Sequence, residues 1–143
     1  MHRIIPFLAL IGALLIAGCS SSTPSVTTGR KVIEDRIASE SKGLIKLVSF
    51  KKTNGQSFEV MGIKGYKMEY EARIEFLADC MWGGGGGPGQ VQGMFAAEPS
   101  PWKARNESNP AFKGKQQALK NQQPFLTGTL TFEQTEQGWR ASK

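Results

Sequence analysis

Alternating apolar and polar positions between residues 66 and 82 form the strongest pattern in the chain. Every second residue there is apolar or small: Tyr66, Met68, Tyr70, Ala72, Ile74, Phe76, Ala78, Cys80 and Trp82. Successive side chains of a strand point to opposite faces, so the pattern predicts a strand with one buried and one solvated face. Seventeen residues at ~3.3 Å each would reach ~56 Å. We therefore expect the strand to bend or break, at Ala72 or at Leu77.

A helix and a first strand are predicted before this segment. Residues 30–42 place apolar side chains at the spacing of a short amphipathic helix, closed by Gly43: Val32, Ile33, Ile37 and Ala38. Residues 44–53 alternate like a strand, but the parity slips near Leu47 and Val48, which predicts a β-bulge. Asn54-Gly55 then predicts a turn.

Two further strands are predicted at the carboxyl end. From Phe125 the chain again alternates, with Leu126, Gly128, Leu130 and Phe132 on one face. Residues 136–138 predict a tight turn and a short closing strand. Together these elements predict an α+β fold, in which one short amphipathic helix packs on a bent antiparallel sheet of about four strands.

Residues 83–124 interrupt this order with an irregular insert rich in glycine and proline. We expect disorder or a functional loop here, with disorder favoured, because a structureless segment of this length is uncommon inside a small domain. Within the insert, residues 91–97 are a candidate for a short strand.

The amino terminus carries a targeting signal. A short positive start precedes an apolar run that is too short to span a bilayer comfortably, as in a secretory signal. The run ends in Ile16-Ala17-Gly18-Cys19, which resembles the lipobox of bacterial lipoprotein precursors. The resemblance implies cleavage before Cys19 and acylation of Cys19, including its sulfur. The alternative is an ordinary signal peptide with an incidental cysteine.

This resemblance sets the expected domains and location. Residues 1–18 are the signal peptide, residues 19–29 a lipidated flexible tether rich in Ser and Thr, and residues 30–143 a single domain. Ser20 after the lipidated cysteine favours the periplasmic face of the outer membrane in a Gram-negative cell. The formal net charge of +6 comes without a dense Lys/Arg stripe, so we expect no nucleic-acid partner.

A looser resemblance covers residues 30–143. The KTNG turn, the YKMEYEA strand and the closing TGTLTFEQTEQGWR segment resemble a group of small uncharacterised bacterial lipoproteins. The element order also resembles cystatin-like and nuclear-transport-factor-2-like folds, in which a bent sheet wraps a helix. Such folds often contain a conical cavity, so the resemblance implies a binding site without naming its ligand.

Candidate chemistry is sparse. The only histidine is His2, inside the signal, so a mature chain would lack histidine-dependent triads and most zinc sites. We therefore expect no catalytic residue, metal or cofactor. Cys80 is interpreted as a small buried hydrophobe, since Cys19 carries the lipid, and a reactive thiol is the alternative. One strand face carries the best acidic cluster, interpreted as solvated: Glu69, Glu71, Glu75 and Asp79.

Aromatic residues on the other face of the same strand are the candidates for contact with a ligand. These ligand-facing candidates are Tyr66, Tyr70, Cys80 and Trp82; a purely structural role in the core is the favoured interpretation. The sequence thus predicts a lipid-anchored, non-enzymatic binding module of the cell envelope with a protein or glycan partner. The alternatives are an envelope enzyme that uses the acidic face, and an assembly factor that acts through the insert at residues 83–124.

Overall fold

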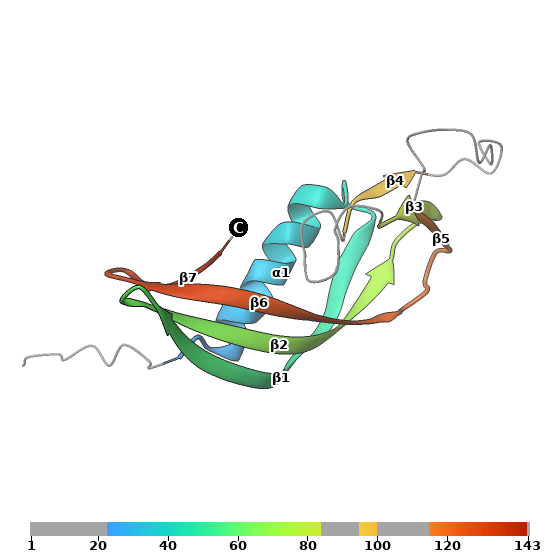
Figure 1. Cartoon of the computed structure of the whole chain (residues 1–143). Helices are drawn as coiled ribbons and strands as arrows, with labels where there is room; N and C mark the ends of the chain where they lie inside the picture. Colours follow the sequence, from blue (N-terminus) through green and yellow to red (C-terminus); the bar gives the residue numbers. More distant parts are fainter. Residues whose placement is uncertain (1–22, 84–94, 100–114, 143) are drawn as a thin grey trace, which may run out of the picture.

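The computed structural model describes residues 23–83, 95–99 and 115–142. The helix α1 packs on an antiparallel four-stranded sheet with the order β1-β2-β6-β7, which confirms the predicted α+β fold (Figure 1). A three-stranded sheet with the order β4-β3-β5 lies at one end. The bounds are α1 Val26–Glu40, β1 Ile45–Val60, β2 Ile63–Phe76, β3 Cys80–Trp82, β4 Ala97–Pro99, β5 Gln116–Ala118, β6 Phe125–Thr135 and β7 Gly138–Ala141.

The helix begins earlier than predicted. It starts at Val26 instead of residue 30, because the Ser25 side chain caps it by accepting a hydrogen bond from the Thr28 backbone N–H at 3.0 Å. Residues 26–29 therefore belong to the helix and not to a tether. At the other end, Lys42 and Gly43 both take positive φ angles, of 51° and 76°, so the helix closes next to the predicted glycine.

The predicted turn at Asn54-Gly55 is wrong, because β1 continues through both residues. Gly55 lies beneath the Tyr66 ring, where a Cβ atom would meet the Tyr66 hydroxyl oxygen, so this glycine makes room for a side chain. The chain instead reverses at Met61 and Gly62. Their φ angles of 52° and 79° suit the two-residue turn that joins twisted antiparallel strands.

The predicted bulge in β1 is confirmed. The pairing of β1 with β2 shifts between Leu47 and Ser49, which leaves Val48 outside the register. A second shift lies between Lys52 and Asn54. Each shift bends the strand, so the sheet curves around the helix, as Figure 1 shows.

The long central segment breaks at the second of the two predicted places. Strand β2 ends at Phe76 and β3 begins at Cys80, whereas Ala72 pairs in register with both of its neighbours. The Leu77 N–H donates to the Leu44 carbonyl at 2.9 Å, which holds the bend against the start of β1.

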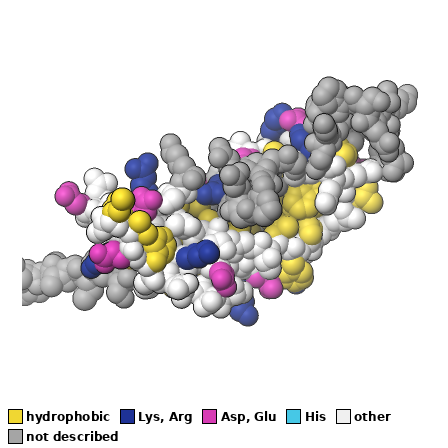
Figure 2. Space-filling view, viewed as in Figure 1, with side chains coloured by type: hydrophobic (Ala, Val, Ile, Leu, Met, Phe, Trp, Pro, Cys, Tyr) yellow, Lys and Arg dark blue, Asp and Glu magenta, His cyan; other side chains and the backbone are white. Residues whose placement is uncertain are grey.

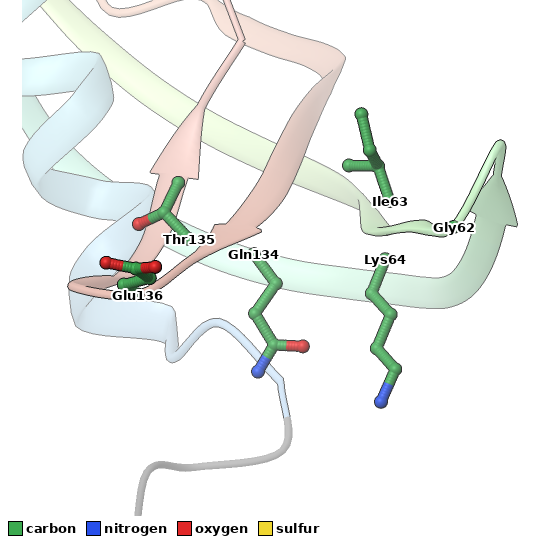
Figure 3. Close-up of a pocket in the computed structure, with 6 residues that line it drawn as sticks. All are labelled: Gly62, Ile63, Lys64, Gln134, Thr135 and Glu136. Atoms are coloured by element: carbon green, nitrogen blue, oxygen red, sulfur yellow. The ribbon is translucent and has the colours of Figure 1, made fainter.

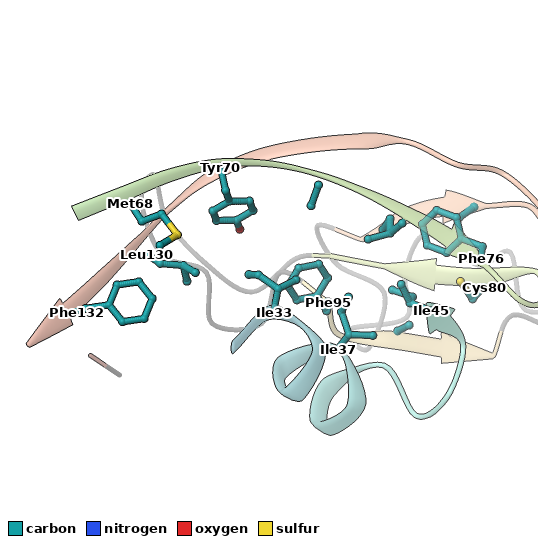
Figure 4. Packing of buried hydrophobic residues seen from close by; sticks show 14 of the residues in the cluster. Ile33, Ile37, Ile45, Met68, Tyr70, Phe76, Cys80, Phe95, Leu130 and Phe132 are labelled. Atoms are coloured by element: carbon teal, nitrogen blue, oxygen red, sulfur yellow. The ribbon is translucent and has the colours of Figure 1, made fainter. Parts of the chain in front are cut away.

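The core lies between α1 and the inner face of the sheet, where the predicted alternation holds (Figure 4). Helix residues Ile33 and Ile37 face the sheet, whereas Ala38, which was predicted to share that face, is exposed. Nearly all of the even-numbered side chains of β2 are removed from solvent, and β6 adds Leu130 and Phe132. At the end near the small sheet, Phe76 meets Trp82 edge to face at 5.1 Å between ring centroids.

The insert at residues 83–124 contributes ordered structure that the sequence did not predict. Strands β4 and β5 flank β3, and Phe95, Ala97 and Ala118 are buried in the common core. Residues 121–124 then follow the end of β2, where the Asn121 N–H donates to the Phe76 carbonyl at 2.7 Å. The candidate strand at residues 91–97 lies outside the described residues except for its last three positions, the last of which begins β4. Segments 84–94 and 100–114 also lie outside them.

Candidate functional site

The four ligand-facing candidates do not form a common surface. Tyr66, Tyr70 and Cys80 are buried, with exposed fractions of 5%, 1% and 0%, and Trp82 is half-buried. The Tyr66 ring meets Trp139 edge to face at 6.2 Å and receives a hydrogen bond from the Lys52 ammonium group on its hydroxyl. These side chains are therefore placed as core residues.

Tyr70 is the most unusual of these residues. Its ring stacks on Phe50 at 5.3 Å and lies over Gly128, its partner across the strand pair. Its hydroxyl group is buried and makes no hydrogen bond with any residue that the structure describes. Burial raises the pKa of Tyr70, and the nearby Arg36 charge opposes that rise. Tyr70 therefore stays a neutral packing residue.

The Cys80 thiol is enclosed where β3 meets the core. Burial raises its pKa, and the Asp79 carboxylate raises it further. A thiol with a raised pKa carries little of the nucleophilic thiolate at neutral pH. The buried position agrees with the interpretation of Cys80 as a small hydrophobe.

The acidic face of β2 points away from the helix. Glu75 pairs with Lys46 at 3.0 Å and accepts a hydrogen bond from the Gln123 amide at 3.2 Å. Asp79 accepts the backbone N–H of Lys120 at 2.8 Å, while Glu69 is exposed. Within the described ranges, no group of three or more His, Cys, Asp or Glu side chains has the arrangement of a metal site.

A shallow groove lies where the end of the β1–β2 hairpin separates from the end of the β6–β7 hairpin (Figure 3). Its volume is about 530 Å³ and its lining residues are Gly62, Ile63, Lys64, Gln134, Thr135 and Glu136. Lys64 and Gln134 extend side by side, whereas Ile63 points to the other side of the hairpin. The lining thus offers an ammonium, an amide and a carboxylate group to a polar ligand.

The tip of the β1–β2 hairpin carries exposed apolar side chains, which we call the tip patch: Phe58, Val60, Met61 and Ile63. Their exposed fractions are 38%, 58%, 98% and 54%. Figure 2 shows hydrophobic side chains at the end of the molecule where Figure 1 places the tips of the two hairpins. This patch was not among the expected sites, although apolar residues on both sides of Gly62 indicate it in the sequence.

The outer edge of β1 is the other exposed feature. Strand β1 pairs only with β2 among the described strands, so one side of its 16-residue backbone faces outward. Lys46, Lys51 and the two register shifts lie along it. Lysines and bulges are devices that prevent edge-to-edge pairing. This edge is therefore a poor docking site for an extended peptide.

Comparisons place the chain in no established class. Neither a protein-family model, nor a curated protein, nor a solved structure matches it. Among the residues that the structure describes, no helix has the length and apolar character needed to cross a bilayer. Residues 16–19, which resemble a lipobox, lie outside the described residues, so the lipobox stays a prediction from the sequence.

Proposed function

We propose that the chain is a lipoprotein of the bacterial cell envelope that is anchored through Cys19 and works as a non-enzymatic binding module. The observation that carries this proposal is the sequence Ile16-Ala17-Gly18-Cys19 directly after an apolar run. Two or more acyl chains on one residue would give stable membrane attachment, whereas one chain gives only marginal binding. The outer membrane, on its periplasmic face, is the proposed location because Ser20 follows Cys19.

The described structure supports a binding role through the groove at the hairpin ends. Lys64, Gln134 and Glu136 offer donors and acceptors to a polar segment of an envelope protein or to a glycan. By contrast, Tyr66, Tyr70 and Cys80 are occupied in the core. The groove is therefore the proposed binding surface.

An envelope enzyme that uses the acidic face is the weaker proposal. Glu75 and Asp79 are each held by hydrogen bonds to neighbouring segments, and Glu69 lies exposed on the outer face. Catalytic carboxylate pairs instead converge on one bond of a substrate from two sides. An assembly role through residues 83–124 rests on segments that are mostly outside the described residues, so it has less support than the groove.

The anchor is tested by replacing the acylated residue. Cys19→Ala should abolish incorporation of labelled fatty acid and leave the unprocessed precursor in the envelope fraction. Cys80→Ala is the matched control, because it removes the other cysteine of the chain and should leave the label unchanged. Undiminished labelling of Cys19→Ala would contradict the proposed anchor.

The binding surface is tested by crosslinking in the native envelope. A photoreactive amino acid at position 134 should capture a defined partner, because Gln134 lines the groove. The same amino acid at position 39, which is exposed on α1, should not capture it. Identical products from both positions would contradict binding at the groove.

A further inference from the structure

The tip patch is a continuous apolar surface on one face of the hairpin. Val60 pairs directly with Ile63, and Phe58 pairs with Gly65. Residues that face each other across an antiparallel pair project to the same side. The Phe58 ring covers Gly65, where an added Cβ atom would clash with the ring. The ring thus lies flat on the hairpin beside Val60 and Ile63, and Met61 forms the apex.

The paired patch residues lie on the outer face of the sheet, opposite to the face that α1 covers, because Ile63 and Gly65 alternate with the buried Tyr66 and Met68. The hairpin that carries them extends past the helix start. Gly29 in the first turns of α1 packs on Met68, which fixes the level of the sheet at which the helix begins. From Met68 to Gly62 the strand advances by ~20 Å, and from Gly29 to Val26 the helix advances by ~4.5 Å. The hairpin tip therefore projects by ~15 Å beyond the helix start, in the direction that Figure 1 shows.

Methionine is an unfavourable residue type for the backbone conformation at position 61. Its φ angle of 52° lies in the left-handed region, where a side chain costs ~1–2 kcal/mol and Asn or Gly is preferred. Its side chain is nevertheless 98% exposed and makes no use of the core. Neither the turn geometry nor the packing of the domain explains a methionine at the apex, whereas contact with an apolar phase outside the chain does.

The proposed anchor lies close in sequence to the helix start. Cys19 precedes Val26, the first helical residue, by seven positions. Seven residues span at most ~25 Å, so an acylated Cys19 would keep the helix start within ~25 Å of the bilayer surface. The hairpin tip projects by ~15 Å beyond that start, so the tip patch can reach the bilayer without strain in the connection.

We infer that the tip patch is a second, membrane-contacting element that inserts into the lipid headgroup region and fixes the orientation of the domain. This inference rests on the proposed lipid anchor. Insertion would place the neighbouring groove at the bilayer surface, so its ligand would be a polar group presented there. Two weak membrane contacts on one chain reinforce each other, because the first raises the effective concentration of the second.

The contact would be hydrophobic more than electrostatic. Lys64 and Glu59 face each other across the hairpin next to the patch, so the charges near the tip largely cancel. A polybasic surface would require anionic lipid and would weaken as salt rises. The tip patch should instead contact zwitterionic and anionic bilayers alike.

The experiment uses the full acylated chain, purified from the envelope and reconstituted in vesicles. An environment-sensitive dye is attached to Met61→Cys, and to Leu77→Cys as the matched control. Leu77 is also an exposed apolar residue, but it lies at the opposite end of β2. The buried Cys80 thiol leaves the introduced cysteine as the reactive one, since the Cys19 sulfur carries lipid. Brominated lipids serve as the quencher.

Side chains at ~5–10 Å depth reach the acyl boundary, so we expect dye emission at position 61 to shift to the blue and to be quenched about twofold or more. Position 77 should stay in water. Val60→Thr with Ile63→Thr in the Met61→Cys chain should reduce the quenching, while circular dichroism shows an intact fold. The result should be the same in phosphatidylcholine and in vesicles that contain phosphatidylglycerol.

Three outcomes would overturn the inference. In the first, an acylated chain keeps the dye at position 61 in water, which leaves the anchor proposal standing. In the second, dye pairs at position 61 report concentration-dependent contact between copies without lipid quenching, which assigns the patch to a second copy of this chain. In the third, the chain carries no fatty-acid label, which removes the anchor and the tether argument together.

Discussion

The two ends of the β1–β2 pair differ in what covers them. At the covered end, next to the small sheet, Phe76 is 1% exposed and meets the Trp82 ring edge to face. At the open end, the last eight residues of β1 are all exposed, including Val60. Apolar side chains occur at both ends, so their presence does not decide burial. The difference comes from the face on which they lie and from the segments that cover it: Phe76 is on the inner face of the sheet, whereas Val60 is on the outer face.

Contacts made by the carboxyl end of the helix close the covered end. The Glu40 carboxylate accepts the Phe95 N–H at 3.1 Å, and the Lys42 ammonium group binds Glu98 at 2.7 Å. Both bonds join residues more than 50 positions apart in the chain. No comparable segment lies over the tip patch among the residues that the structure describes. Among the described residues, bonds of this kind therefore stabilise the covered end of the sheet.

Truncation of a phenylalanine at each end should give the largest contrast. Phe76→Ala should lower the free energy of unfolding by about 3–5 kcal/mol, because it opens a cavity in the covered core. Phe58→Ala makes the same chemical change in the tip patch, where the ring is 38% exposed, and should cost about 1 kcal/mol or less. Chemical denaturation followed by circular dichroism measures both. Equal losses would contradict the division into two ends.

Overpacking under the helix should have the next largest effect. Gly29 lies on the buried face of α1, and a Cβ atom there would sit 2.6 Å from the Met68 sulfur and 3.0 Å from the Phe50 ring. Gly29→Val should therefore destabilise the domain by about 1–3 kcal/mol, despite the poor helix propensity of glycine. Thr27→Val, on the exposed side of the same helical turn, is the control and should change stability by about 0.5 kcal/mol or less. A neutral Gly29→Val would show that the helix is free to move away from the sheet.

The same contrast separates what the sequence predicts from what it does not. The alternation in β2 and β6 predicted the core positions, because a strand with one buried face repeats every two residues. The small sheet was missed because each of its strands has three residues, too few for a period, and its neighbours lie 15 or more positions apart. The turn predicted at Asn54-Gly55 was wrong because this dipeptide is typical of hairpin turns, whereas Gly55 is needed here to make room for the Tyr66 ring.

The candidate site also has a part that the sequence could predict and a part that it could not. The residue types made candidates of Tyr66, Tyr70 and Cys80. Their alternation in the sequence already favoured a place in the core, and the structure places them there. The groove could not be predicted, because it depends on how the ends of two hairpins separate in space. The proposed lipobox at residues 16–19 has no such dependence on folding, since a lipobox is a linear signal.

The apex of the open end should respond to substitution in the opposite direction. Met61→Asn gives the Asn-Gly pair that this turn favours, at a position where φ is 52°. The free energy of unfolding should stay unchanged or rise by up to about 1 kcal/mol. Ile63→Thr is the control, because it also removes an exposed apolar side chain from the tip patch but lies in β2 and keeps a β-branched residue there. A loss of stability in Met61→Asn would mean that Met61 stabilises the fold. Its presence at the apex would then no longer indicate contact with an apolar phase outside the chain.

The smallest effect concerns the ion pair that closes the covered end. The hydrogen bond from Lys42 lowers the pKa of Glu98 from its usual value of 4.5, and the nearby Lys115 acts in the same direction. A carboxyl group whose pKa is lower in the folded state contributes stability above its unfolded pKa, and this contribution is lost as the pH falls through the folded pKa. Lys42→Met should therefore reduce stability slightly at neutral pH, and the difference from the parent chain should shrink as the pH falls below the usual Glu98 pKa of 4.5 and through the lowered folded pKa.

Glu98→Gln provides the control for this pair, because it removes the titrating group and leaves the ammonium group of Lys42 in place. In the Glu98→Gln background, Lys42→Met should show no change of its effect between pH 7 and pH 3. Carbon-detected nuclear magnetic resonance of the Glu98 carboxyl group gives the pKa directly, and Lys42→Met should raise it toward the usual value. A Glu98 pKa that does not move would mean that Lys42 does not hold this carboxylate in solution. The helix end would then be attached to β4 mainly by the Glu40–Phe95 hydrogen bond and the apolar core.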